Sequence, residues 1–270
     1  MAVGSIDAQT EWSTALAGCN TLIHLAAYQP DGKGGIAQLK VCRRVNVQAT
    51  VNLARQAAQA GVKRFVFVSS VKVNGETSLE GRPFTEQDIP APVEPYGVSK
   101  WEAEQRLLEI AAATLMELVI VRSPLVYGCG VRGNMQSLER MVRLGLPLPL
   151  GGIRNQRSMV SLTNLVDFLL LCCIHPGAAH ETFLASDGMD VSVPVLLARM
   201  GVIIGIPTKL LPAPVWMLKM AATSLGQRNL FDKLCGNLQV DATKARIQLG
   251  WTPSQTLDEG LRQMLGSDPR

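Results

Sequence analysis

The sequence predicts an α/β fold, with a parallel sheet covered by helices and a smaller, mostly helical lobe beside it. Two observations carry this prediction. Three short apolar runs, at 20–27, 64–70 and 117–124, have the composition of strands that are buried on both faces. Two longer runs with helical spacing, at 36–61 and 96–115, separate them, so strands and helices alternate along the chain.

The first half of the chain is predicted as one strand–helix–strand–helix–strand unit. The helix after the strand at 20–27 ends in a Gly61–Val–Lys–Arg step, which is typical of a helix C-terminus. The strand at 64–70 ends in two serines, the second helix begins near Tyr96, and the strand at 117–124 closes the unit. Such connections are right-handed and place the strands parallel in one sheet.

After residue 125 the chain changes character. Short helical runs alternate with connectors rich in Pro and Gly, and these runs lie at 133–144, 164–174, 193–204, 212–225 and 256–265. We predict that residues 1–125, rejoined by residues 158–186, form the sheet lobe. Residues 126–157 and 187–270 form the smaller lobe.

Composition and charge narrow the class of protein. Of the 270 residues 47% are hydrophobic, so the chain can form a full core and is not a disordered polymer. The formal charge of +4 is not gathered into a run, which argues against nucleic acid as a partner. The six cysteines lack the spacing of a metal site, and we expect reduced thiols and no metal. No uncharged apolar run reaches the roughly 18 residues of a spanning helix, and no secretory signal is visible, so we expect a cytoplasmic protein without membrane insertion.

The most specific pattern joins Tyr96 and Lys100 to a pair of serines. A tyrosine and a lysine four residues apart on a helix lie on one face, and an ammonium beside a phenol lowers the phenol pKa from about 10 toward a useful range. Ser70 ends a buried strand, where open α/β sheets place their active sites, and its hydroxyl can bind the oxygen that Tyr96 protonates. This tyrosine–lysine spacing alone is common and mostly structural. Following a strand that ends in Ser69 and Ser70, it predicts a catalytic set.

Four segments in this order resemble one family: HLAA (24–27), SSVKVNG (69–75), YGVSK (96–100) and RSPLVYG (122–128). The chain is similar to the extended short-chain dehydrogenase/reductases, and within them to nucleotide-sugar epimerases and dehydratases of the UDP-glucose 4-epimerase kind. The segment at 146–167 resembles the subgroup acting on UDP-N-acetylhexosamines, including UDP-4-keto-sugar reductases. The resemblance covers nearly the whole chain. It implies a Rossmann-like sheet, a substrate-binding smaller lobe, NAD or NADP as cofactor, a UDP-sugar substrate and a homodimer.

The resemblance also implies roles for the serines, the tyrosine and the lysine. Tyr96 acts as acid and base at the sugar 4-oxygen, Lys100 holds the nicotinamide ribose, and Ser70 hydrogen-bonds the 4-oxygen with Ser69 beside it. The dinucleotide is approached by the end of the first strand. The residues implied there are His24, Ala26 and Ala27.

Further positions follow from the same resemblance. Pro124 and Val126 lie where the backbone passes the nicotinamide amide. Asn134 matches a position that reaches toward the diphosphate, and Arg157 matches a diphosphate-binding arginine, whose fork suits phosphate geometry. Asn46 lies where the family often has an asparagine, and we interpret it as structural.

One part of the family pattern is missing. The family begins with a strand, a glycine-rich turn of the GxxGxxG kind and a helix whose N-terminus holds the pyrophosphate, and no such turn precedes the run at 20–27. The opening MAVGSID resembles the end of the third strand, with Ser5 in place of an aspartate that contacts the adenine. The resemblance therefore implies an N-terminally truncated Rossmann sheet with an exposed edge strand and weak cofactor binding. A misassigned start, a fragment and a shortened protein all remain open.

The expected activity is hydride transfer at C4 of a UDP-hexose or UDP-N-acetylhexosamine, as an epimerase or a 4-keto-sugar reductase. A dehydratase is disfavoured, because that branch has an Asp–Glu pair where this chain has Val71 and Lys72. One alternative is a non-catalytic remnant or fragment that binds a nucleotide sugar or a partner chain. Another is a sensor of the same fold, which Asn134 and Arg157 disfavour because they make sense only for a diphosphate.

Overall fold

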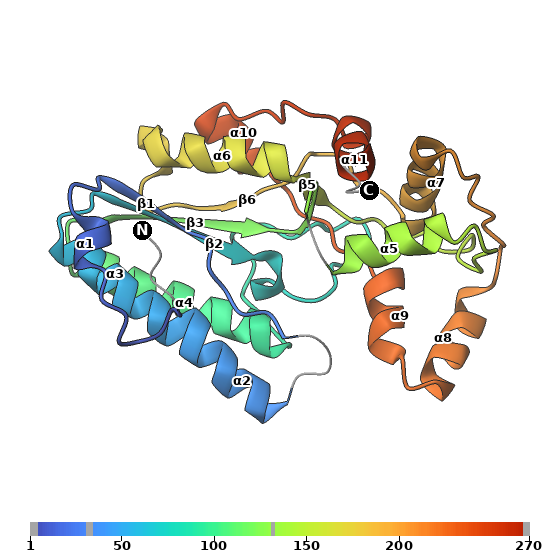
Figure 1. Ribbon diagram of the computed structural model, residues 1–270, viewed down its shortest axis with the longest axis horizontal. Coiled ribbons are helices and arrows are strands. Elements are labelled where there is room, and N and C mark those ends of the chain that lie inside the picture. The colour runs from blue at the N-terminus through green and yellow to red at the C-terminus, as the bar shows by residue number, and fades with distance from the viewer. Residues whose placement is uncertain (1–4, 31–34, 131–132, 267–270) are drawn as a thin grey trace.

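The computed structural model describes residues 5–30, 35–130 and 133–266, without the side chains of residues 134, 229 and 230. Figure 1 shows a central sheet with helices on both faces and a helical lobe at one end. The predicted α/β class with a Rossmann-like parallel sheet is confirmed.

The main sheet has the strand order β1-β2-β3-β6, and every neighbouring pair is parallel. Its strands are β1 (Thr21–His24), β2 (Arg64–Ser70), β3 (Glu117–Ser123) and β6 (Thr182–Leu184). Ser70 is in register with Ser123, so β2 and β3 end at the same edge of the sheet. Within the described residues β1 pairs with β2 alone, which makes β1 an edge strand.

Alternating side chains on the strands pack against helices on opposite faces. Phe65 and Phe67 lie in one core with residues of α3 and α4, whereas Val66 lies in another with residues of α6 and α10. The first face carries α1 (Ser13–Leu16), α2 (Ile36–Cys42), the π-helical turn η1 (Arg43–Gln48), α3 (Ala49–Gln59) and α4 (Pro95–Ala112); the second carries α6 (Leu162–Ile174) and α10 (Thr243–Leu249). Two short 3₁₀ turns, η2 (Val71–Val73) and η3 (Pro176–Ala178), follow β2 and α6.

Three helices begin at residues that are favourable at a helix N-terminus. Proline is the first residue of α4, where its missing N–H leaves no bond unmade. The Ser161 hydroxyl caps α6 by accepting from the Asn164 N–H at 3.1 Å. Helix α7 (Val193–Ile204) begins after Ser192, whose hydroxyl accepts from the Val195 N–H at 3.3 Å.

The second lobe has its own apolar core. It is built around β4 (Leu125–Tyr127) and β5 (Met159–Ser161), which pair in parallel, together with α5 (Asn134–Arg143), α7 and α11 (Leu257–Gly266). Helices α8 (Val215–Ser224) and α9 (Arg228–Cys235) form a hairpin at the lower right of Figure 1. The helices predicted after residue 125 are confirmed as α5, α6, α7, α8 and α11; the exact lobe boundaries stay a prediction. No helix in the described part of the chain is long and apolar enough to cross a membrane.

Candidate active site

Ser70 stands at the end of β2, where the chain turns into η2. Its hydroxyl accepts a hydrogen bond from the Lys72 N–H at 3.3 Å, and the side chain is largely buried. Because β2 and β3 end together, this hydroxyl lies at the carboxyl edge of the sheet. This is the edge at which parallel sheets bind their ligands.

Tyr96 reaches this edge because the residue after it is glycine. A Cβ on Gly97 would lie 2.8 Å from the Lys72 carbonyl oxygen, closer than such atoms approach. The first turn of α4 therefore packs directly against residue 72, two residues beyond Ser70. This close approach places the first turn of α4, with Tyr96, near the carboxyl end of β2, where Ser70 lies.

Lys100 lies one turn further along α4 and is almost fully buried. Its Nζ is 4.1 Å from the centroid of the Phe67 ring, which faces it from β2. Burial lowers the pKa of Lys100 to about 7, although Glu104 opposes this shift. Burial also raises the pKa of Tyr96 to about 12, and Cys42 adds to the shift. The direction for Tyr96 differs from the lowered pKa expected from the sequence, because burial disfavours the charged form of both groups.

A buried ion pair stands directly behind the lysine. Glu104 lies four residues after Lys100, and its carboxylate receives the Arg122 Nη2–H at 2.6 Å and Nε–H at 3.1 Å. The Ser69 hydroxyl donates to the same carboxylate at 2.5 Å. Arg122 also donates to the Asn74 Oδ1 at 3.2 Å. The hydroxyl of Ser69 is thus engaged within the protein, and its predicted contact with a cofactor stays a prediction.

Glu104 and Arg122 are not among the site residues predicted from the sequence. A glutamate one turn after Lys100 on the same helix face was a visible signal. An arginine within the apolar run of β3 was another, since a buried charge requires a partner.

The side chain of His24 belongs to the core. Its Nε2 lies 2.8 Å from the Thr50 hydroxyl, and its ring stacks on Phe67 with the centroids 5.9 Å apart. Burial, followed by the charge of Lys100, lowers the pKa of His24 to about 4, so the ring is neutral at pH 7. The predicted cofactor contact of His24 therefore rests on its backbone. Ala26 and Ala27 follow in the loop after β1, and their roles stay predictions.

Asn46 ties this loop to α4 from within the π-helical turn η1. Its Oδ1 accepts from the Tyr28 N–H at 2.6 Å, and its Nδ2 donates to the Tyr28 carbonyl and to the Ser99 hydroxyl, both at 2.9 Å. Ser99 in turn donates to the Tyr96 carbonyl at 2.8 Å. The interpretation of Asn46 as structural is confirmed, and its structural task is to hold the Tyr28 loop beside the first turn of α4.

A cavity of about 240 Å³ opens in the second lobe and contains Arg157. One guanidinium nitrogen of Arg157 donates to the Gly236 carbonyl at 2.9 Å, and burial lowers the pKa of this arginine. The cavity is lined by Leu125, Ser137, Leu138, Met141, Arg157, Met159, Val191, Val193, Leu196, Lys233 and Leu234.

Pro124 is buried between β3 and β4, and Val126 is half-buried in β4. Asn134 begins α5, but its side chain lies outside the described residues.

Ion pairs link the cavity to the sheet edge. Glu94 directly precedes α4 and forms ion pairs with Lys72 and, at 3.1 Å, with Lys233 of α9. Burial alone would raise the pKa of Glu94, but the two lysines hold it below its usual range. One carboxylate thus joins the residues beside Ser70 to the wall of the cavity.

The nicotinamide end of a dinucleotide fits these residues. Among the described residues no acceptor takes a hydrogen bond from the Lys100 Nζ, which carries three donors at the end of an almost fully buried side chain. A pair of ribose hydroxyls would satisfy those donors. Within the same part of the chain, no cluster of three or more His, Cys, Asp or Glu residues could hold a metal ion.

Comparison with known proteins places the chain in a family. The pattern of the NAD dependent epimerase/dehydratase family matches residues 2–183. The chain belongs to this family. Its similarity to UDP-glucose 4-epimerase of Vibrio cholerae is 45% identity over 264 residues, covering 97% of this chain and 80% of that protein.

Two further relatives agree with this assignment. N-acetyl-alpha-D-glucosaminyl-diphospho-ditrans,octacis-undecaprenol 4-epimerase of Escherichia coli O157:H7 is 30% identical over 281 residues, which cover 97% of this chain and 82% of that protein. The solved structure of MoeE5 in complex with UDP-glucuronic acid and NAD is 26% identical, with a TM-score of 0.75 over 96% of this chain and 83% of that one. The family therefore extends over both lobes.

Proposed function

We propose that this member of the family is an NAD(P)-dependent epimerase or reductase acting at C4 of a UDP-hexose or UDP-N-acetylhexosamine. The observation that carries the proposal is the close packing of α4, which holds Tyr96 and Lys100, on residue 72, two residues beyond Ser70 at the carboxyl edge of the sheet. The names of the relatives, which are 4-epimerases of UDP-sugars or a diphosphate-linked sugar, support it over a non-catalytic remnant.

Each catalytic residue has a definable task in such a reaction. The nicotinamide that this family takes from NAD supplies the hydride acceptor and donor. Tyr96 receives the proton of the 4-hydroxyl as a phenolate and returns it as a phenol. Ser70 donates a hydrogen bond to the same oxygen. The ammonium form of Lys100 favours the phenolate, so the charge of Lys100 influences the pKa of Tyr96 and therefore the fraction of Tyr96 that can accept a proton.

We propose that Arg157 and the cavity receive the nucleotide end of the substrate. A guanidinium with one nitrogen fixed on the Gly236 carbonyl keeps its remaining donors for a diphosphate. Lys233 adds a second positive charge to the same wall. Asn134 stays a proposed contact on the evidence of the resemblance alone.

The test separates turnover from binding in two variants. We expect Tyr96→Phe to lower kcat for UDP-hexose epimerisation by about 10²–10⁴-fold while UDP-sugar affinity changes little, since only the proton transfer is removed. Arg157→Ala should instead weaken UDP-sugar binding, measured by calorimetry, without weakening binding of the free sugar. Full turnover by Tyr96→Phe would remove the catalytic assignment. No turnover by the unaltered chain, with UDP-sugar and NADH binding retained, would favour the remnant.

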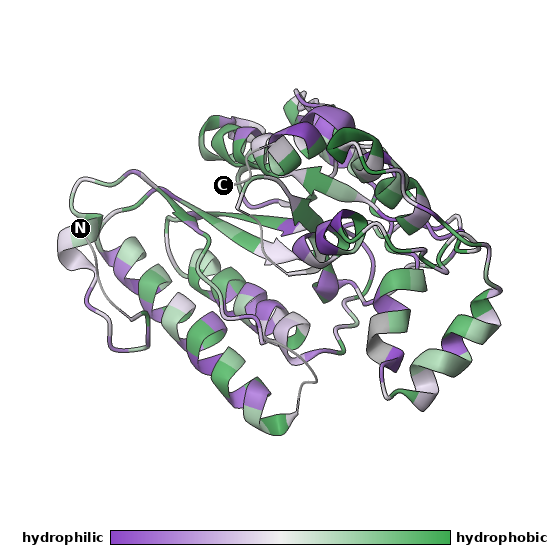
Figure 2. Ribbon diagram, turned by 45° about the vertical axis from the view of Figure 1, so that its right-hand side comes forward, coloured by the Kyte–Doolittle hydropathy of each residue, from purple (hydrophilic) through white to green (hydrophobic). Residues whose placement is uncertain are grey.

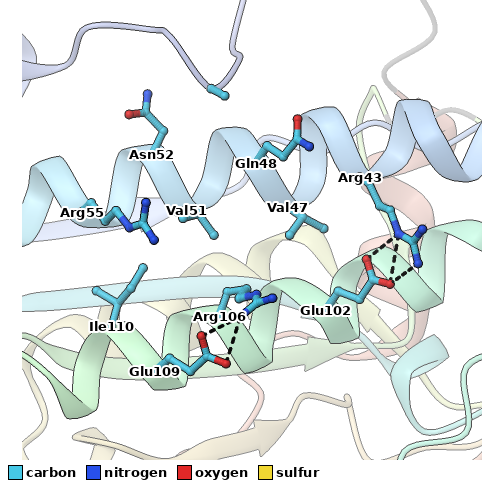
Figure 3. A pocket seen from close by; sticks show the side chains of 11 residues that line it. Arg43, Val47, Gln48, Val51, Asn52, Arg55, Glu102, Arg106, Glu109 and Ile110 are labelled. Atoms are coloured by element: carbon cyan, nitrogen blue, oxygen red, sulfur yellow. Dashed lines mark hydrogen bonds and ion pairs between the residues drawn. The ribbon is translucent and has the colours of Figure 1, made fainter.

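We also propose a homodimer formed through a groove of about 660 Å³ between α3 and α4, shown in Figure 3. Val51 and Ile110 line its floor, with Arg55 on the α3 side and Glu109 on the α4 side. A two-fold axis places the apolar floor of one copy against that of the other. A cytoplasmic location is supported by Cys42 and Cys172, two buried cysteines that form no disulfide.

A further inference from the structure

Helix α8 is apolar and yet exposed along its whole length. Its sequence is VWMLKMAATS, and none of its residues is buried. Trp216 is 64% exposed and Met220 is 65% exposed. Figure 2 shows this helix largely in the colours of apolar residues at the outer edge of the second lobe. A helix of this composition is normally covered, because exposed apolar patches of this kind mark interaction sites.

The charged residues closest to α8 in the sequence are basic. Between Val191 and Phe231 the sequence contains no aspartate or glutamate. The same stretch carries exposed basic residues on both sides of the helix and within it: Lys209, Lys219 and Arg228. The apolar surface therefore has a mainly positive rim, and the first acidic residue beyond it in the sequence is Asp232 of α9.

We propose that the surface formed by Leu211, Val215, Trp216, Met217, Met220 and Leu225, called the α8 surface below, docks on an anionic lipid bilayer. Tryptophan prefers the headgroup region of a membrane, and lysine and arginine beside it bind anionic headgroups. A helix of ten residues is about 15 Å long, half the thickness of the hydrocarbon core, so it lies in the interface and does not cross it.

A bilayer satisfies this surface better than a folded partner does. Helix α9 packs on one side of α8, and the exposed apolar residues spread over the rest of the helix without forming one stripe, so a protein partner would have to enclose α8 on more than one side. Acyl chains can pack around an inserted helix without a preformed complementary pocket. Anionic headgroups can pair with the basic residues of the rim in any orientation of the helix.

Docking would place the proposed substrate cavity next to the membrane. Helix α9 follows α8 in the hairpin, and it supplies Lys233 and Leu234 to the cavity wall. Docking itself rests on the surface of α8 and does not depend on the proposed reaction. Turnover of a water-soluble UDP-sugar therefore tests the reaction separately.

The test is co-sedimentation of the purified chain with lipid vesicles. We expect binding to phosphatidylcholine mixed two to one with phosphatidylglycerol, and much weaker binding to phosphatidylcholine alone. The double variant Trp216→Ser/Met220→Ser should reduce the partition coefficient at least about tenfold, since each side chain loses its apolar burial. Leu115→Ser removes a fully exposed leucine from the α4–β3 connection and is the matched control. Lys219→Glu should weaken binding to the anionic vesicles alone.

Three results would overturn the proposal. One is the absence of binding to anionic vesicles. A second is equal binding by the double variant, with circular dichroism confirming that each protein is folded. The third is a concentration-dependent oligomer that the double variant abolishes, which would assign the α8 surface to a second copy of the chain.

Discussion

At the scale of single residues, the Glu104 carboxylate controls the charge of Lys100. It favours the ammonium form, against the burial that lowers the lysine pKa to about 7. We expect Glu104→Gln to lower this pKa further, so that the fraction of charged Lys100 at neutral pH falls. The pH profile of kcat should then shift toward acid by a measurable part of a unit, with the KM for UDP-sugar unchanged.

A second variant separates this effect from instability. Glu104→Gln leaves the Arg122 guanidinium buried without its counter-ion, which costs about 3–5 kcal/mol of unfolding free energy. Adding Arg122→Met removes that unpaired charge and should restore part of the stability. The shifted pH profile should persist in the double variant, because Lys100 still lacks its carboxylate. A profile that returned to its original position would exclude this role for Glu104.

His24 predicts an acid sensitivity of the fold. Its pKa is about 4 in the folded protein and 6.5 in the unfolded chain, so the unfolded state binds more protons between these values. The stability that the protein gains from keeping this ring neutral is fully present above pH 6.5. As the pH falls from 6.5 to 4, the unfolding free energy decreases by about 3 kcal/mol. In urea titrations, His24→Gln should show a smaller loss of unfolding free energy over this window. Equal losses in both proteins would contradict the buried-histidine account.

The proposed catalytic residues could be identified from the sequence because their signal is local. Tyr96 and Lys100 are one helical turn apart, and Ser70 ends a strand whose apolar character is plain. The pairing of Glu104 with Arg122 depends on how α4 packs on β3, and no local pattern contains that information. The same packing buries Tyr96 and reverses the expected direction of its pKa shift.

At the scale of elements, the contact between α4 and η2 depends on Gly97. We expect Gly97→Ala to push the first turn of α4 away from the Lys72 carbonyl, since the added Cβ would lie 2.8 Å from that oxygen. A displacement of this size should lower kcat about 10²-fold through misplacement of Tyr96, with a smaller effect on UDP-sugar affinity. Gly61→Ala is the contrasting variant: its Cβ meets nothing within 4 Å, but its φ of +80° is strained, so it should cost stability and spare kcat.

Elements were predictable in proportion to their length. The three apolar runs of seven or eight residues became β1, β2 and β3, and the two long helical runs became α2–η1–α3 and α4. Strands β4, β5 and β6 have three residues each, too few for an alternating pattern to be recognised. Their positions follow from pairing with distant strands, as β6 pairs with β3.

At the scale of the whole molecule, the α3–α4 groove predicts the oligomeric state. We expect Val51→Asp to place a charge in the apolar floor of the groove and to convert the dimer into a monomer, measured by sedimentation equilibrium. Trp216→Ser, on the distant α8 surface, should remain dimeric. A wild-type chain that is monomeric at high concentration would end the dimer proposal.

Because of the π-helical turn η1, the exact number of residues in the helix from α2 to α3 matters. This turn lies between α2 and Thr50, whose hydroxyl is hydrogen-bonded to His24. It contains Asn46, which is hydrogen-bonded to Tyr28 in the loop after β1. Removing one residue from η1 would convert it to an ordinary α-helical turn and rotate everything before it by about 100° relative to α3. Asn46 and Thr50 could then no longer face their partners together. Insertions and deletions in this helix should consequently be rejected in any library of variants, even where single substitutions are accepted.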